Sequence, residues 1–341
     1  MKQRAVARPL DISILALPQT TPMSVYGLYE IFAAVGSVWS KLTGETVRVR
    51  PLAPKIVAKT RRQFRSSLGT PIAPHASIDD DAVADVVIVT DIALPIDDAT
   101  PRSWTNEMRW VRRQLDAGAL VCSVCTGAVF LAEAGLLDGS EVASHWSAAA
   151  LFRERYPKIA FRPERILCRS GNNGRMITTG GASSYEDLAL HLIARYCGRE
   201  ESVRIAKIFV LGDRSDGQLP FAMMVRPKIH ADAVVSSCQR WLAKHHTLTN
   251  PVTRMVARSG LAERTFKRRF KAATGYTPVA YVQALRIEEA KQKLEQGRAS
   301  IEAIAAAVGY EDPAFFRRIF KRHAGVTPGE YRQRYRAPAP A

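Results

Sequence analysis

The chain has 341 residues, enough for two domains, and 47% of them are hydrophobic, which suffices for a sizeable core in each domain. Its formal net charge of +17 favours an anionic partner such as a nucleic acid. Five cysteines in a chain of this length exclude a disulfide scaffold, and no apolar run is long enough for a transmembrane helix or a secretory signal. We therefore expect a cytoplasmic protein with no membrane partner.

The first two hundred residues alternate between strand-like and helix-like segments. Two of these segments, 84–90 and 119–124, are predominantly apolar, as in strands that helices cover on both faces. The alternation predicts an α/β fold, with a mostly parallel, flavodoxin-like sheet flanked by helices. The expected strands are residues 10–17, 46–52, 84–90, 119–124, 165–169 and 175–179, and the expected helices are residues 24–34, 104–117, 127–134 and one that opens at a capping box, 183–186, and ends at Gly198.

One of these strands leads directly into a cysteine. Segment 119–124 is followed by Cys125, Thr126 and Gly127, where the next helix begins. This order places Cys125 on a sharp elbow at the carboxyl edge of the sheet, which is the edge where open α/β sheets bind ligands. A helix N-terminus lowers the pKa of a nearby thiol. The elbow is therefore the candidate functional site of this half of the chain.

The elbow also carries a family resemblance. Together with segment 135–139 and the run Ser144-His145-Trp146, it resembles the DJ-1/PfpI group of the class I glutamine amidotransferase-like fold. In the enzymes of that group a histidine directly follows the cysteine, and a carboxylate near the first helix supports the thiol. This chain has Thr126 and Ser24 at those two positions. The departures remove groups that activate a nucleophile, so we expect no catalysis.

We expect the elbow to form the floor of a small-molecule pocket instead. The expected ligand-binding residues are Ser24, Cys125, Thr126 and His145, of which Cys125 and His145 are also the residual catalytic candidates. Three alternatives stay open for Cys125: a hydrolase or glyoxalase-type activity, a redox sensor, and a buried thiol that only packs. Cys122 and Cys125 have CxxC spacing but no second pair of ligands with suitable spacing, so we expect neither a metal nor a cofactor.

The last hundred residues contain one pattern twice, at a spacing of fifty residues. Each copy has an apolar helical segment, a glycine turn at Gly260 or Gly309, and a second helix that is basic on its outer face. In the second copy Asp312 is the expected N-cap of that helix. This arrangement is typical of a helix-turn-helix, whose second helix enters the DNA major groove. The matching positions are Phe266 and Phe316, Phe270 and Phe320, Gly275 and Gly325, and Pro278 and Pro328.

Two such units in register resemble the AraC-type DNA-binding domain, in which a long helix joins both units. Residues 279–294 would form that helix, with Tyr281, Leu285 and Ala290 facing the core. The fusion of this all-α domain to a DJ-1/PfpI-like domain resembles the branch called GlxA-like regulators. The expected domains are a sensor and dimerisation domain (1–211), a linker (212–230), a DNA-binding domain (231–336) and a disordered tail (337–341).

Charge is concentrated in the repeated region. From residue 230 onward the chain has 20 Lys and Arg against 9 Asp and Glu, whereas the preceding residues have 29 against 23. A basic surface binds phosphates regardless of sequence, while base choice needs side chains at the groove edges. We expect base contacts from Arg264, Lys267, Arg268, Ala314, Arg317 and Arg318, and phosphate contacts from Lys271, Lys321 and Arg322.

These observations predict a transcription regulator that binds double-stranded promoter DNA. The resemblance implies a homodimer that acts as an activator with RNA polymerase and responds to a small nitrogenous metabolite. The competing hypotheses are a DJ-1/PfpI-type cysteine enzyme and a thiol redox sensor, each tethered to DNA.

Overall fold

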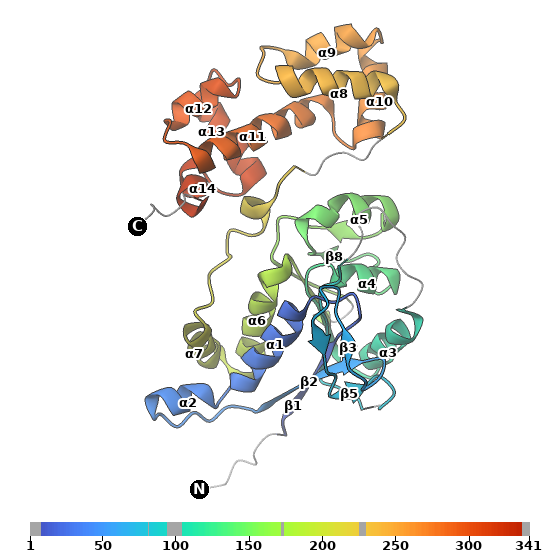
Figure 1. Ribbon diagram of the computed structural model, residues 1–341, viewed down its shortest axis with the longest axis vertical. Helices are drawn as coiled ribbons and strands as arrows, with labels where there is room; N and C mark the ends of the chain where they lie inside the picture. The colour runs from blue at the N-terminus through green and yellow to red at the C-terminus, as the bar shows by residue number, and fades with distance from the viewer. Residues whose placement is uncertain (1–7, 81, 94–103, 172–173, 225–229, 336–341) are drawn as a thin grey trace. The chain divides into compact units, whose positions relative to one another are not determined.

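Figure 1 shows the computed structural model, which describes residues 8–80, 82–93, 104–171, 174–224 and 230–335. The chain divides into two compact units, Met1–Gln218 and Leu219–Ala341. The division falls within segment 212–230, for which the sequence predicts a linker. The expected disordered tail, 337–341, lies outside the described residues.

The first unit is built on a seven-stranded sheet with the order β10-β11-β7-β6-β1-β2-β5. All neighbouring strands in it are parallel except β10 and β11, which are antiparallel. The strands of this sheet are β1 (Leu10–Leu15), β2 (Leu52–Ala58), β5 (Ala76–Ser77), β6 (Val86–Val89), β7 (Leu120–Ser123), β10 (Leu167–Ser170) and β11 (Met176–Thr179). Two further pairs are β3 (Phe64–Arg65) with β4 (Pro71–Ile72) and β8 (Glu141–Val142) with β9 (Ala160–Phe161).

Helices cover both faces of this sheet, as the apolar strands predict. Every residue of β6 and β7 is buried, and a separate hydrophobic core lies on each face. One core packs against α1 (Pro22–Ala34), α6 (Tyr185–Cys197) and α7 (Arg199–Phe209); the other packs against α3 (Thr105–Asp116), α4 (Gly127–Glu133) and α5 (Ala149–Arg155). The short helix α2 (Val38–Thr43) completes the unit. The predicted α/β fold is confirmed.

Two local predictions are wrong. Segment 46–52 is not a strand, because β2 begins only at Leu52. The alternation there comes from two half-buried valines, Val47 and Val49, in a loop. The strand itself was missed because it contains Pro54, a residue that is unusual inside a strand. Proline fits at this point because Pro54 pairs with β1 on one side only, while β5 contacts β2 at Val57 and Ala58. The capping box at 183–186 does not form either, because a 3-10 turn, Ala182–Ser184, leads into α6 without a side-chain cap.

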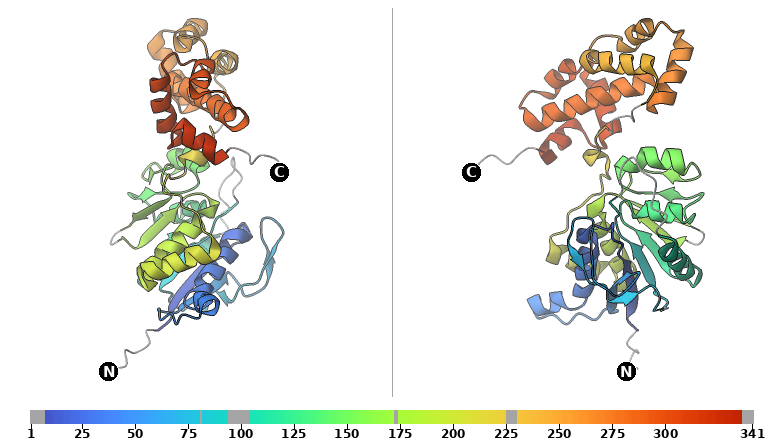
Figure 2. Two further views of the ribbon diagram at one scale, coloured as in Figure 1. Left: turned by 90° about the vertical axis from the view of Figure 1, so that its left-hand side faces the viewer. Right: turned by 45° about the vertical axis from the view of Figure 1, so that its right-hand side comes forward.

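The second unit consists of helices. Its long helix α11 lies between two groups, α8 to α10 and α12 to α14 (Figures 1 and 2). Each group has its own core, and α11 contributes residues to both cores. The helices are α8 (Ala233–His245), α9 (Pro251–Ser259), α10 (Glu263–Thr274), α11 (Pro278–Gln296), α12 (Ile301–Ala307), α13 (Pro313–Ala324) and α14 (Pro328–Tyr335). The predicted pair of helix-turn-helix units on one linker helix is confirmed as a fold.

The two repeated units have the same fold because equivalent residues are buried, or end a helix, at equivalent positions in each unit. The four repeated phenylalanines are fully buried, and both turn glycines, Gly260 and Gly309, have the positive φ that stops a helix. At Gly309 a Cβ would lie 2.4 Å from the carbonyl oxygen of Thr247, so only glycine fits. Asp312 caps α13 as expected, accepting a hydrogen bond from the backbone N–H of Ala314 at 2.8 Å.

Candidate functional sites

The predicted elbow is present at the carboxyl end of β7. Cys125 has a φ of +52°, a left-handed conformation that is costly for a residue with a side chain. Its N–H donates to the carbonyl oxygen of Thr179 at 3.1 Å, which ties the elbow to the end of β11. Gly127 follows because a Cβ there would lie 2.6 Å from the carbonyl oxygens of Val89 and Thr90. The elbow therefore stores strain at the edge of the sheet where ligands bind in such folds.

One expected ligand-binding residue, Thr126, and a further serine, Ser144, hold the elbow in place. The hydroxyl of Thr126 donates to the carbonyl oxygen of Ile92 at 2.6 Å and accepts from its N–H at 2.8 Å. Thr126 thus joins the start of α4 to the loop after β6. Ser144 contacts Cys125 as well, because its buried hydroxyl donates to the Cys125 carbonyl oxygen at 2.7 Å.

His145 lies beside this contact but has a different partner. Its Nδ1 accepts from the N–H of Ser147 at 3.2 Å and lies 2.7 Å from the Ser147 hydroxyl oxygen. Burial lowers the pKa of the imidazole. His145 is therefore held as a neutral ring near the elbow.

The structure adds a carboxylate to the elbow that the sequence analysis missed. Asp91 follows β6 and is only 4% exposed, and the hydroxyls of Ser24 and Thr21 both donate to it. Burial raises the pKa of Asp91, although both hydroxyls counter this effect. Ser24 lies in α1 and donates to this carboxylate, which comes from the loop after β6. The sequence feature that could have revealed this carboxylate is an aspartate directly after the buried segment 84–90.

The environment of Cys125 does not activate its thiol. Burial is the main cause that raises the pKa of Cys125 to about 12, and the nearby charge of Asp91 adds to it. The expectation that the helix N-terminus would lower this pKa is wrong, because the thiol is only 6% exposed and faces a carboxylate. Proton transfer from this thiol at neutral pH is therefore unfavourable.

The nine expected DNA-contacting residues share one property, because all of them are exposed on α10 or α13. The buried phenylalanine pair of each helix lies on the opposite side. Several of these side chains have intramolecular partners: Lys267 pairs with Glu263 at 2.5 Å, Arg317 pairs with Glu302, and Arg322 donates to Gln283 at 3.0 Å. Such exposed pairs exchange readily for phosphate or base contacts.

A neighbouring arginine has a structural role instead. Arg269 donates two hydrogen bonds of 2.9 Å to Asp232, the N-cap residue of α8. This bidentate pair links α8 to α10 and leaves the charge of Arg269 satisfied within the fold.

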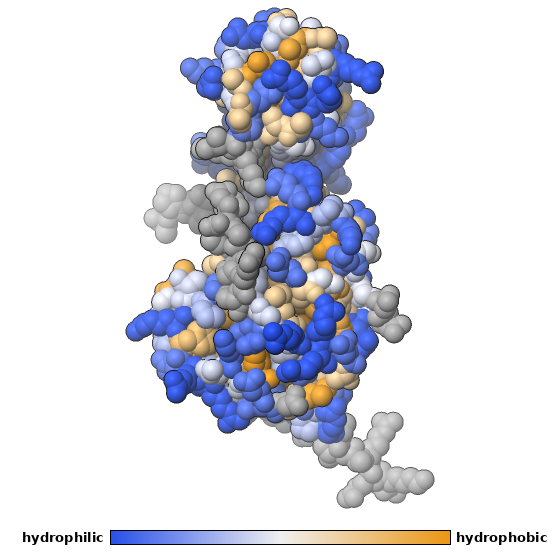
Figure 3. All heavy atoms as spheres, turned by 90° about the vertical axis from the view of Figure 1, so that its right-hand side faces the viewer, coloured by the Kyte–Doolittle hydropathy of each residue, from blue (hydrophilic) through white to orange (hydrophobic). Residues whose placement is uncertain are grey.

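Within the part of the chain that the structure describes, no group of three or more His, Cys, Asp or Glu side chains could hold a metal ion. None of the described helices has the length and apolar character needed to cross a bilayer. On the face shown in Figure 3, hydrophilic residues predominate and hydrophobic ones are dispersed among them.

The fold and the two sites define a class of protein in which an α/β domain with a cysteine elbow precedes a paired helix-turn-helix domain. Residues 35–195 match the DJ-1/PfpI family, and residues 255–334 match a helix-turn-helix domain family. The chain thus joins a DJ-1/PfpI domain to a C-terminal AraC-type helix-turn-helix domain.

Several proteins with similar sequences are named as HTH-type transcriptional regulators. The HTH-type transcriptional regulator CdhR of Pseudomonas aeruginosa is 29% identical over 69% of this chain and 69% of its own length. The regulator GbdR of the same species is 28% identical over 80% of this chain and 72% of its own length. The regulator GlxA of Rhizobium meliloti is 26% identical over 66% and 68% of the two chains. The resemblance to GlxA-like regulators is confirmed.

Proposed function

We propose that this protein is a cytoplasmic, sequence-specific DNA-binding transcription regulator. The observation that carries the proposal is the pair of basic helices, α10 and α13, which one helix, α11, holds within a single unit. Their buried phenylalanines fix each helix, and their exposed arginines and lysines are available for DNA. Similar proteins named as HTH-type regulators support this use.

The exposed residues of α10 and α13 include two groups, one suited to contact bases and the other suited to contact phosphates. Arg264, Arg268 and Arg318 have guanidinium groups suited to the O6 and N7 atoms of guanine, and Ala314 offers an apolar contact to a thymine methyl group. Lys271, Lys321 and Arg322 lie toward the helix ends, where they would contact phosphates. Base contacts then set the sequence, and phosphate contacts add affinity that depends on salt.

The elbow would be the effector site. Cys125, Thr126 and His145 follow strands or precede helices near the carboxyl edge of the sheet, Ser24 lies in the first turn of α1, and Asp91 adds a buried carboxylate beside Ser24. An anionic group in a buried site favours a cationic ligand, in keeping with a nitrogenous metabolite. The effector must bind the DNA-competent state of the protein more tightly than the other state in order to change promoter binding. The regulator would act as a homodimer and activate RNA polymerase.

Selection of DNA from the source genome tests the proposal. Sheared genomic DNA is incubated with the purified chain, and bound fragments are sequenced. The expected result is enrichment of discrete promoters by the wild-type chain and loss of that enrichment in Arg268→Ala/Arg318→Ala. Uniform recovery of all fragments would contradict the proposal, since it would show binding to phosphates alone.

A further inference from the structure

A cleft lies at the opposite edge of the sheet from the elbow. The parallel strands β1, β6 and β7 begin at this edge, so it is remote from their carboxyl ends. The cleft has a volume of about 430 Å³ and lies entirely within the first unit. Its walls come from the starts of these strands, the turn before β7 and the end of α6.

Positive charge dominates this cleft. Among its described lining residues, four are arginines, Arg8, Arg50, Arg175 and Arg195, and one, Asp85, is acidic. The four arginines come from four separate places in the chain, so their convergence is a property of the fold. Together these five charged residues leave the cleft with a local excess of three positive charges.

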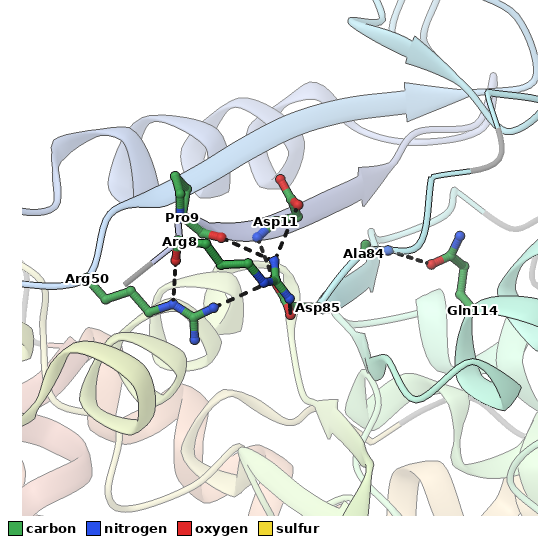
Figure 4. A network of polar contacts seen from close by, with 7 residues as sticks. All are labelled: Arg8, Pro9, Asp11, Arg50, Ala84, Asp85 and Gln114. Atoms are coloured by element: carbon green, nitrogen blue, oxygen red, sulfur yellow. Dashed lines mark hydrogen bonds and ion pairs between the residues drawn. The ribbon is translucent and has the colours of Figure 1, made fainter. Parts of the chain in front are cut away.

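The single carboxylate is already occupied. Arg8 donates to both oxygens of Asp85, at 2.8 Å and 2.5 Å, and the N–H of Asp11 donates to one of them at 2.9 Å (Figure 4). Arg50 lies farther away, with its Nη2 3.9 Å from Asp85. Burial raises the pKa of Asp85, but these hydrogen bonds and charges outweigh it and bring the pKa below its usual value. Asp85 therefore stays ionised and mainly balances Arg8.

The other three guanidinium groups retain hydrogen-bonding capacity. Arg50 donates through Nε to the carbonyl oxygen of Arg8 at 3.0 Å, and Arg175 donates through Nη1 to that of Leu115 at 2.8 Å. Each bond uses one of the five N–H donors of a guanidinium group. Arg195 lies 5.5 Å from the ring centre of Tyr196. These contacts position the side chains and, apart from the distant pairing of Arg50 with Asp85, involve no carboxylate.

Tyr196 and several apolar residues form the rest of the cleft. The pKa of Tyr196 is raised mainly by burial, and the charges of Arg195, Asp85 and Arg50 also act on it. Leu10 and Ala119 are buried in the wall, whereas Val83 is 57% exposed. Val83 and Ala117 therefore supply the exposed apolar surface among the described lining residues.

We propose that this cleft binds a small organic anion that carries phosphate or carboxylate groups. Guanidinium groups form bidentate, charge-assisted hydrogen bonds with both kinds of group, and the apolar wall would cover the organic part of the ligand. This site is separate from the elbow and goes beyond the proposed function, on which it does not depend.

Chemical protection of arginines tests the proposal on the intact chain. The chain is treated with phenylglyoxal, which modifies arginine side chains, and the rate at each arginine is followed by peptide mass spectrometry. Adenosine monophosphate serves as the phosphate probe and citrate as the carboxylate probe. We expect one or both probes to slow modification of Arg50, Arg175 and Arg195 several-fold, while Arg109 on α3 and Arg153 on α5, which are exposed and do not line the cleft, react at an unchanged rate. The probe that protects identifies the anionic group.

Two results would overturn the proposal. One is an unchanged modification rate in the cleft with either probe. The other is equal slowing at Arg109 and Arg153, which would show a general effect of ionic strength. A matched pair of variants adds a second readout: Arg195→Gln should weaken binding of the protecting probe by about tenfold in calorimetry, whereas Arg199→Gln, at an exposed position four residues away, should not.

Discussion

The side-chain amide of Gln218 donates a hydrogen bond to the backbone carbonyl oxygen of Ser144 at 2.9 Å. The same amide nitrogen donates to the carbonyl oxygen of Arg165, also at 2.9 Å. Ser144 in turn donates its hydroxyl to Cys125, so Gln218 is two hydrogen-bonded steps from the elbow. Gln218 is also the last residue of the α/β unit before the helical unit begins. These contacts connect the candidate effector site to the end of its unit.

Gln218→Leu should therefore weaken the α/β unit around the elbow. Leucine has a similar size but cannot donate, which leaves the buried carbonyl oxygen of Ser144 unpaired at about 1–3 kcal/mol and also removes the part-buried hydrogen bond to Arg165. Hydrogen exchange at the amides of β7 and β11 should become faster. The control is Gln63→Leu, at an exposed position of the same unit. Equal exchange in both variants would contradict the structural role of Gln218.

The thiol of Cys125 should be unreactive at neutral pH. With a pKa raised to about 12 by burial and by Asp91, the thiolate fraction is very small, so alkylation by iodoacetamide at pH 8 should be on the order of a hundredfold slower than for free cysteine. Mass spectrometry of the modified peptide measures the rate. Alkylation as fast as that of free cysteine would instead support the enzyme or redox-sensor hypothesis.

Asp91→Asn should stabilise the protein at neutral pH. The folded state raises the pKa of Asp91, so this carboxyl favours folding below its unfolded pKa of about 3.9 and loses that contribution as the pH rises through the raised value. The asparagine variant lacks this loss. Its advantage in unfolding free energy should be largest at neutral pH and shrink toward pH 4. Urea unfolding across this range would contradict the account if wild type gained on the variant as the pH rose.

Two adjacent arginines of α10 should behave differently. Arg268→Ala should weaken binding to a selected promoter by about 1–3 kcal/mol and leave stability unchanged, because its side chain is exposed and would contact a base. Arg269→Ala should lower the stability of the helical unit by less than about 1 kcal/mol, because it removes the partly exposed pair with Asp232. Thermal unfolding and fluorescence-based DNA titration separate the two effects. Equal loss of DNA affinity in both variants would contradict the assignment.

The helical half was predictable because its information is local and repeated. The phenylalanine pairs four residues apart, the turn glycines and the cap at Asp312 each act over a few residues, and each appears where the sequence placed it. The elbow was predictable for the same reason, since Cys125 and Gly127 follow one buried strand.

The chemistry of the elbow depends on contacts between distant parts of the chain. Asp91 meets Ser24 across 67 residues and raises the pKa of Cys125, which lies beyond the next strand. Gln218 reaches Ser144 across 74 residues. The convergence of Arg8, Arg50, Arg175 and Arg195 likewise arises only when the sheet forms. Local patterns cannot specify such pairings, which depend on strand order.

The most direct test of the regulator proposal is the ratio of two affinities at one salt concentration. The purified chain is titrated with a promoter fragment recovered from its own genome and with a scrambled fragment of equal length and composition, at physiological ionic strength. We predict a ratio of at least about 10³ in favour of the promoter, reduced toward one in Arg268→Ala/Arg318→Ala. A ratio near one for the wild-type chain would contradict sequence-specific binding and leave only a basic, phosphate-binding surface.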